Sequence, residues 1–148
     1  MIRLATLKDL PDLVRLGLEL HRSSDHVRHN FKPEKVAEKL AEIIEGNSTV
    51  VFVAERNGEI IGGFAGGVTE LWYSDSLIGF DYSLFIQQGK RHGITAIRLL
   101  IAFEEWAKIM GAKEIHMGIT TGINVESTSK LYESRGFNQI GPLFCKEV

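Results

Sequence analysis

The chain has 148 residues, which is long enough for one domain to bury an apolar core without disulfides or metals. Hydrophobic residues make up 44% and charged residues 24%, which is globular usage and argues against a disordered chain. The formal net charge is 17 − 19 = −2, so no overall positive field favours a nucleic acid as partner. We therefore expect one domain over residues 1–148 and no nucleic-acid partner.

Cysteine content and hydropathy indicate the compartment. Cys145 is the only cysteine, so no intrachain disulfide can form. The first residues lack the apolar core of a signal peptide, and no stretch approaches the roughly 20 apolar residues that span a bilayer. A cytoplasmic protein without membrane contact is the expectation.

The first third of the chain predicts a strand followed by two helices. Residues 1–6 alternate apolar and polar side chains, which is typical of a short strand. Thr6 begins a capping pattern, and the apolar face after it predicts a helix. The segment 21–32 has no clear period and is predicted as a loop. Pro33 begins a second predicted helix, which ends at Gly46.

The middle of the chain has the period of strands. Two apolar runs, 49–56 and 59–68, flank an Asn-Gly pair and predict a hairpin. Four glycines in the stretch 62–67 predict a bulge or a close approach of backbones. Residues 76–86 predict a further strand.

The last third predicts a helix, a strand, a short helix and closing strands. Apolar residues step by three and four through the helix, which ends near Met110. A strand over 113–119, a helix over 127–136 and closing strands over 137–148 follow. The order β-α-α-β-β-β-α-β-α-β predicts an α/β (α+β) fold, in which helices cover both faces of a mixed sheet.

The segment "QQGKRHG" joins the strand that ends at Ile86 to the helix that begins near Thr95. A glycine-containing turn at a helix start presents free N–H groups to an anion, and phosphate is the usual occupant. Lys90, Arg91 and His92 add positive charge. Neither standard glycine fingerprint for phosphate is present. Phosphate binding and a solvated basic turn are both open on these residues alone.

This segment resembles the signature of the Gcn5-related N-acetyltransferases (GNAT). That signature is Arg or Gln, two residues, Gly, one residue, and Gly or Ala, between a strand and a helix. Arg91 and Ala96 match its first and last positions, and Ile94 stands where glycine is usual. A register one residue earlier puts Gly93 at the glycine position but matches neither end.

A second stretch, "GINVESTSKLYESRGF", is similar to another hallmark of the same family. There an Asn opens a helix that carries "LYE" and is followed by "GF", and Asn124, Tyr132, Gly136 and Phe137 match. The tail also resembles short phage- and prophage-type members. The resemblance implies the GNAT fold over nearly the whole chain.

The resemblance implies acetyl-CoA as co-substrate and no metal. In the family the pyrophosphate lies on backbone amides of the loop, and the pantetheine arm pairs with the end of the preceding strand. The residues that it assigns to acetyl-CoA binding are Leu84, Phe85, Ile86, Arg91, His92, Gly93, Ile94, Thr95, Ala96, Asn124 and Ser127.

The resemblance also implies catalytic roles. It makes Tyr132 the general acid, which suits a phenol with an ordinary pKa of about 10; the alternative is a tyrosine that packs on the sheet. Asp81 is the candidate general base, and by the period of two it shares a face with Ser83 and Phe85. The alternative is a polar residue paired with a neighbour. His116 is a weaker rival as base.

The acceptor site is assigned by the same resemblance to the 21–32 loop. Its three histidines fit no zinc spacing, so we expect them, with Asp25, to shape substrate binding rather than hold a metal. Trp72 and Tyr73 either line the same groove or, as we favour, are core or interface aromatics.

The acceptor that we expect is a primary amine of a small molecule or a protein, and homodimers are frequent in the family. Two alternatives stay open. One is a non-catalytic CoA-binding module that acts through a protein partner. The other is an enzyme that acetylates a macromolecule, and the net charge of −2 disfavours aminoacyl-tRNA as its target.

Overall fold

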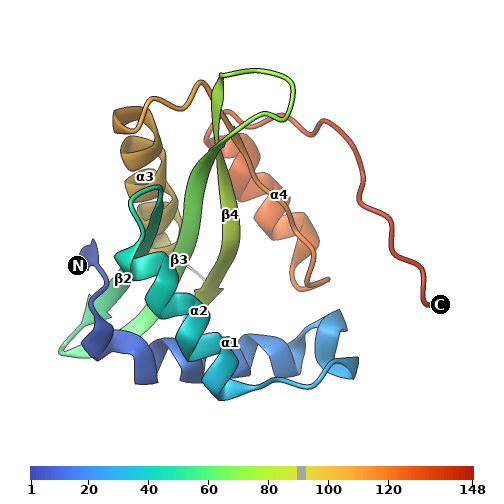
Figure 1. Ribbon diagram of the computed structural model, residues 1–148. Helices are drawn as coiled ribbons and strands as arrows, with labels where there is room; N and C mark the ends of the chain where they lie inside the picture. Colours follow the sequence, from blue (N-terminus) through green and yellow to red (C-terminus); the bar gives the residue numbers. More distant parts are fainter. Residues whose placement is uncertain (90–92) are drawn as a thin grey trace.

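The computed structural model describes residues 1–89 and 93–148, and a mixed sheet forms its centre (Figure 1). Its strands, in spatial order, are β1 (Ile2–Leu4), β2 (Thr49–Arg56), β3 (Glu59–Glu70), β4 (Leu77–Ile86) and β5 (Glu114–His116). Neighbours from β1 to β4 pair antiparallel, whereas β5 runs parallel to β4. The predicted α/β class is confirmed.

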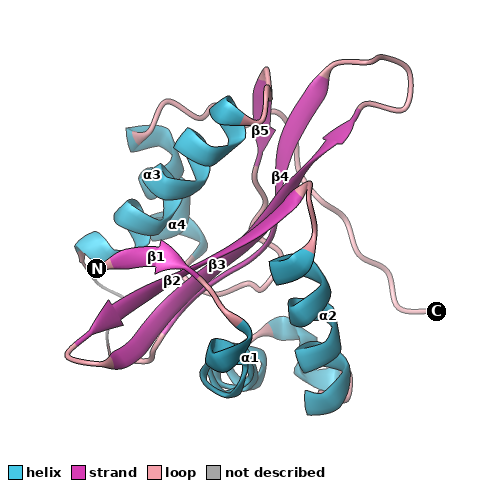
Figure 2. Ribbon diagram, turned by 60° about the vertical axis from the view of Figure 1, so that its left-hand side comes forward, coloured by secondary structure: helices cyan, strands magenta, loops and turns pink. Residues whose placement is uncertain are grey.

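Helices cover both faces of the sheet. They are α1 (Leu10–Ser23), α2 (Pro33–Glu45), α3 (Ile94–Ile109) and α4 (Val125–Ser134), with short 3₁₀ helices η1 (Leu7–Asp9) and η2 (Asp25–Arg28). Figure 2 shows α1 and α2 on one face and α3 and α4 on the other. In the described part of the chain, every helix is too short or too polar to cross a membrane.

Each face has its own apolar cluster. Leu13 and Leu16 of α1 are buried against β2, β3 and β4, and Leu99 and Phe103 of α3 are buried on the opposite face. The Phe103 ring lies 4.5 Å from that of Phe64 in β3. The three-four spacing of the α3 side chains thus packs that helix on the sheet, as the sequence predicts.

The β2–β3 hairpin forms where the Asn-Gly pair predicts it. Asn57 and Gly58 both have positive φ, 53° and 78°, as the tight turns favoured in hairpins require. The predicted irregularity in the glycine-rich strand is also present, because the β3–β4 register shifts between Ala65 and Gly66.

That shift is a bulge centred on Tyr82 of β4. Ala65 pairs with Ser83 and Gly66 pairs with Asp81, so Tyr82 has no partner of its own. One extra residue reverses the alternation of side chains along the strand. Phe85 therefore packs in the α1 cluster, on the face opposite Asp81. The expectation that these two side chains share a face is wrong.

The closing strands predicted over 137–148 are absent from the described chain. Residues 138–148 are exposed, including Ile140, Leu143 and Phe144. The Phe137 ring packs on Tyr132, and Arg28 lies 3.6 Å from the Cys145 sulfur and 3.5 Å from the Glu147 carboxylate. An alternating pattern forms a strand only when it pairs with an edge of the sheet, and in the described chain this segment pairs with none.

Three further expectations need correction. The predicted 113–119 strand is paired only over Glu114–His116, and the 21–32 loop contains the last turn of α1 and all of η2. Trp72 and Tyr73 are 94% and 69% exposed in the β3–β4 connection, so they are not core residues. Their rings pack edge to face with each other, 5.4 Å apart.

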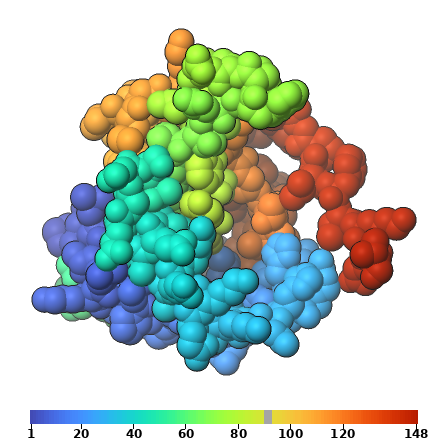
Figure 3. Space-filling view, in the orientation of Figure 1, coloured from blue at the N-terminus to red at the C-terminus, as the bar shows by residue number. Residues whose placement is uncertain are grey.

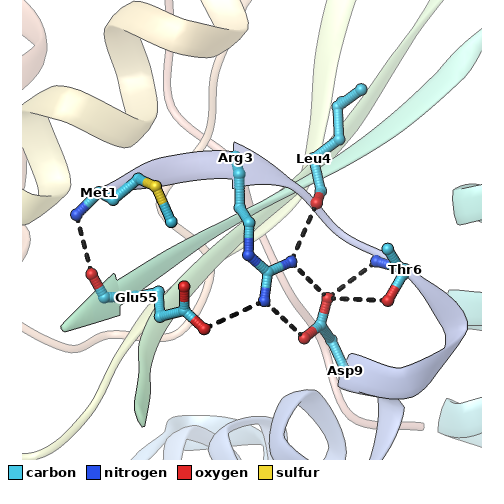
Figure 4. Close-up of polar contacts among 6 residues, drawn as sticks. All are labelled: Met1, Arg3, Leu4, Thr6, Asp9 and Glu55. Atoms are coloured by element: carbon cyan, nitrogen blue, oxygen red, sulfur yellow. Dashed lines mark hydrogen bonds and ion pairs between the residues drawn. The ribbon is translucent and has the colours of Figure 1, made fainter. Parts of the chain in front are cut away.

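An ion-pair network fastens the amino-terminal strand (Figure 4). Two Arg3 nitrogens donate to the two oxygens of Asp9 at 2.8 and 3.0 Å, and Arg3 also contacts Glu55 at 3.4 Å. Asp9 accepts the Thr6 N–H at 2.8 Å, and the Met1 amino group donates to the Glu55 carbonyl. The network joins β1, η1 and β2.

We expect the Asp9→Ala substitution to lower the free energy of unfolding at pH 7 by about 1–3 kcal/mol. The hydrogen bonds that Arg3 donates to the Asp9 carboxylate hold the pKa of Asp9 below its ordinary value. The stabilisation is therefore present above the unfolded-state pKa of about 4, and it is lost as the pH falls through the lower folded-state pKa. Urea unfolding of the wild type and of Asp9→Ala should show a difference in the free energy of unfolding at pH 7 that narrows below pH 4.

Asp12→Ala is the matched control. Asp12 is 48% exposed and lies 3.4 Å from Arg15, so its loss should cost less than about 1 kcal/mol. If both substitutions had the same effect, or if the stability difference between wild type and Asp9→Ala did not depend on pH, the role given to Asp9 would be contradicted.

Candidate active site

A cleft of about 460 Å³ opens where β4 and β5 diverge. The two strands pair only where Ile78–Phe80 lie beside Glu114–His116. Figure 3 shows the molecule hollowed between yellow-green β4 and orange α4. The lining residues are Leu20, Asp81, Tyr82, Ser83, Leu84, Ile86, Gly93, Ala96, Ile97, Gly118, Ile119, Thr120, Thr121, Ile123, Asn124, Ser127, Thr128, Lys130, Leu131, Tyr132 and Ser134.

One peptide unit links the two candidate catalytic side chains. The Gly118 N–H donates to Asp81 Oδ1 at 3.3 Å, and the hydroxyl of Tyr132 donates to the Gly118 carbonyl at 3.4 Å. Asp81 comes from β4, Gly118 follows β5, and Tyr132 comes from α4. The divergence of β4 from β5 brings the carboxyl and phenol groups to one cleft.

Burial changes the acidity of both groups. It raises the pKa of Asp81, and hydrogen bonds from the backbone N–H groups of Asp81 and Gly118 oppose that rise only in part. Burial, with the negative charge of Asp81 as a smaller cause, raises the pKa of Tyr132 above its ordinary value. Asp81 is thus a stronger base than an ordinary aspartate, and Tyr132 keeps its proton at neutral pH.

The floor of the cleft offers backbone groups to an extended ligand. In the described chain, no strand pairs with the β5 side of β4 from Asp81 to Phe85. Free edge groups of this kind hydrogen-bond to an added strand or to an amide-containing chain. The two amides of a pantetheine arm fit such an edge.

The start of α3 lies at one end of this edge. Gly93 is the N-cap residue with φ of 125°, and the first turn of the helix contains no acidic residue. Gly93, Ala96 and Ile97 line the cleft. The unpaired N–H groups and the dipole of a helix start favour a phosphate group. The residues present therefore fit acetyl-CoA.

The start of α4 faces the same cleft. Asn124 has φ of 47°, a left-handed conformation that Asn tolerates better than most residues. Its side chain makes no capping hydrogen bond, while Ser127 Oγ donates to the Asn124 carbonyl at 3.1 Å. Both line the cleft, where the resemblance places them.

Most of the predicted site residues meet in this cleft. The ones that line it are Asp81, Leu84, Ile86, Gly93, Ala96, Asn124, Ser127 and Tyr132. Phe85 and Thr95 are buried outside the lining, and the Ile94 side chain is 52% exposed. A contact of their backbones with acetyl-CoA stays a prediction. Arg91 and His92 lie outside the described residues.

The rival base His116 does not line the cleft. Its Nε2 lies 3.0 Å from the carboxylate of Glu114, which belongs to the same strand, β5. This arrangement favours Asp81 over His116 as the base.

The 21–32 loop is joined to the wall of the cleft, and its role in acceptor binding stays a prediction. The Asp25 N–H donates to the Thr121 carbonyl at 2.9 Å, and the Asp25 carboxylate packs on Gly122. At the end of α1, Leu20 lines the cleft and Glu19 accepts the Gln88 N–H. The segments 19–25 and 118–124 therefore form one border.

Sequence reasoning missed Gly118 and the apolar wall. Gly118 acts through its peptide N–H and carbonyl, so its side chain gives no signal. Leu20, Ile123 and Leu131 look like core residues in the sequence and become visible as lining only when the elements are assembled.

Comparison with known proteins gives matches in structure alone. No family model matches the chain, and no curated protein matches its sequence. A transcriptional regulator from Bacillus halodurans C-125 has a TM-score of 0.81 at 22% identity, covering 100% of this chain and 99% of that one.

Two aminoglycoside acetyltransferases are also similar in structure. Aminoglycoside N-acetyltransferase AAC(6')-Iy in complex with CoA has a TM-score of 0.79 at 18% identity, covering 100% of this chain and 93% of that one. An aminoglycoside acetyltransferase from an uncultured soil metagenomic sample, in complex with sisomicin, has a TM-score of 0.75 at 17% identity. The match covers 100% of this chain and 95% of that one. The GNAT acetyltransferase fold is thus confirmed, without the closing strand of the predicted order.

Proposed function

We propose that the protein is an N-acetyltransferase of the Gcn5-related type, which transfers an acetyl group from acetyl-CoA to a primary amine of a small molecule or a protein. The observation that carries the proposal is the Asp81–Gly118–Tyr132 arrangement in the cleft. The likeness in fold to acetyltransferases and the fit of the β4 edge to a pantetheine arm support it.

Acetyl-CoA supplies an activated thioester, so that a C–N bond to the amine forms, the C–S bond breaks, the amine loses a proton and the CoA thiolate gains one. Asp81 accepts the proton of the amine, which a carboxylate of raised pKa does better than an ordinary one. Tyr132 donates a proton to the thiolate, since its hydroxyl remains protonated.

The position of Ile94 is compatible with acetyl-CoA binding, which the enzyme and the non-catalytic module both require. Ile94 replaces the usual glycine of the family signature, but its side chain is 52% exposed and does not line the cleft. A β-carbon at this position therefore leaves the described entrance of the cleft open.

Calorimetric titration with acetyl-CoA, followed by thiol release from acetyl-CoA in the presence of a panel of primary amines, tests the function. We expect micromolar binding and amine-dependent release of thiol. Binding of acetyl-CoA without thiol release for any amine would favour the non-catalytic module. Absence of acetyl-CoA binding would overturn both the acetyltransferase and the CoA-binding module.

Asp81→Asn tests the role of the base. We expect kcat to fall by about 10²–10⁴-fold, because an amide cannot accept the proton. The free energy of unfolding should not fall at pH 7, since burial already disfavours the charged form of Asp81. A large loss of stability would instead indicate that Asp81 is a structural polar residue.

A further inference from the structure

A second hollow, of about 390 Å³, lies between the end of α1, η2 and the start of α2. Five side chains that carry or can take a positive charge line it: His21, His26, His29, Lys32 and Lys35. They come from one continuous stretch, residues 21–35, which runs from the end of α1 through η2 into the start of α2. Among the described residues, the hollow and the cleft share no lining residue, so the two are distinct there.

The nitrogen atoms of these five side chains are available to a ligand. Across the ranges 1–89 and 93–148, none of them takes part in a hydrogen bond or an ion pair. The His21 ring packs on Phe31 at 5.4 Å, and the His26 and His29 rings stack at 6.5 Å. These ring contacts orient the imidazoles and leave their N–H groups unused.

No carboxylate lines the hollow, although acidic residues outnumber basic ones in the chain, 19 to 17. The two acids nearest in α1 and η2 are engaged elsewhere. Glu19 accepts the Gln88 N–H, and the Asp25 carboxylate packs on Gly122. The positive charge of the hollow is therefore not neutralised from within these two elements.

We propose that this hollow binds a multiply charged oxyanion of the phosphate type. Lysine ammonium groups supply charge, and imidazole N–H groups supply directed hydrogen bonds to phosphate oxygens. The arrangement does not suit a metal, since the described His, Cys, Asp and Glu side chains form no group of three or more placed to hold one. The inference goes beyond acetyl transfer and does not depend on it.

The position of the hollow suggests what the anion does. Leu20 lines the cleft and the next residue, His21, lines the hollow, so the end of α1 contributes to both. An amine acceptor that carries a phosphate group, or a free phosphate compound, would be held beside the acceptor loop. The phosphates of CoA are the other source of the same chemistry.

Histidine ring NMR signals report on the site directly. We would titrate the protein with inorganic phosphate and then pyrophosphate, with chloride at matched ionic strength as the blank. Saturable shifts of the His21, His26 and His29 signals are expected. Lys32→Gln/Lys35→Gln should weaken the affinity about tenfold or more, because two charge-assisted contacts are lost.

Lys8→Gln/Lys113→Gln is the matched control, with the same loss of charge on exposed residues outside the hollow. Shifts that rise linearly without saturation, equal shifts in chloride, or equal weakening by the control pair would overturn the proposal. Since all four lysines are exposed, the remaining spectrum should confirm that each variant is folded.

A CoA titration separates the two sources of phosphate. If CoA leaves the phosphate-saturated histidine signals in place, the site is distinct from that of the co-substrate, as proposed. If CoA displaces phosphate from them, the hollow belongs to the co-substrate site, and the proposal of a separate site is overturned. Neither result depends on acetyl transfer.

Discussion

Replacing Tyr132 by Phe should lower kcat for acetyl transfer by about 10²–10⁴-fold while leaving acetyl-CoA affinity nearly unchanged. The ring fills the same space, so the packing of Tyr132 on Phe137, with ring centroids 5.8 Å apart, is kept. Only the hydroxyl that donates to the Gly118 carbonyl is removed. Thiol release and calorimetric titration measure the two quantities separately.

Tyr73→Phe is the matched control. It removes a phenol hydroxyl from a residue that is 69% exposed and does not line the cleft. It should leave kcat unchanged. If Tyr132→Phe also had no effect, the tyrosine would be a packing residue, and the thiolate would take its proton from water. If acetyl-CoA affinity fell with kcat, Tyr132 would act in binding.

Gly66→Ala should destabilise the fold by about 1–3 kcal/mol or more, since there is no room for a methyl group at this position. A β-carbon on Gly66 would lie 2.6 Å from the Phe80 carbonyl oxygen and 2.7 Å from a ring carbon of Phe103. Gly66 stands at the β3–β4 bulge, where the two backbones approach closely. The free energy of unfolding in urea measures the effect.

Gly141→Ala is the control for the intrinsic effect of the added methyl group. A β-carbon at Gly141 would meet no heavy atom within 4 Å. Its effect should stay within about 0.5 kcal/mol.

Because the bulge sets the face on which Asp81 lies, we also expect folded Gly66→Ala protein to lose acetyl transfer. Retained stability in Gly66→Ala would contradict the close approach.

Local signals in the sequence were sufficient for much of the fold. The Asn57-Gly58 pair predicts the hairpin, because few other residues accept its backbone angles. The apolar spacing of α3 predicts which face it buries. Each of these signals rests on residues close together in the chain, whose preferences act before the tertiary contacts form.

Asp81 and Tyr132 were predicted as catalytic residues through a family resemblance and not through a local rule. Nothing in the chain near Tyr132 indicates a carboxylate from β4 beside it. The two groups are linked through Gly118, which depends on the divergence of β4 from β5.

Three features were decided by the tertiary structure alone. The bulge at Tyr82 reverses the alternation of β4, which a period-two pattern cannot reveal. The tail 137–148 has an apolar pattern but, in the described chain, pairs with no edge of the sheet, so it forms no strand. The histidine and lysine side chains of the second hollow are neighbours in the sequence, but the turn from α1 through η2 into α2 sets which of them line it. The chain by itself therefore determined its helices, its hairpin and its class of fold, because these follow from neighbouring residues. Strand register, the face of each site residue and the cleft depend on contacts between distant segments, and only the folded molecule decides them.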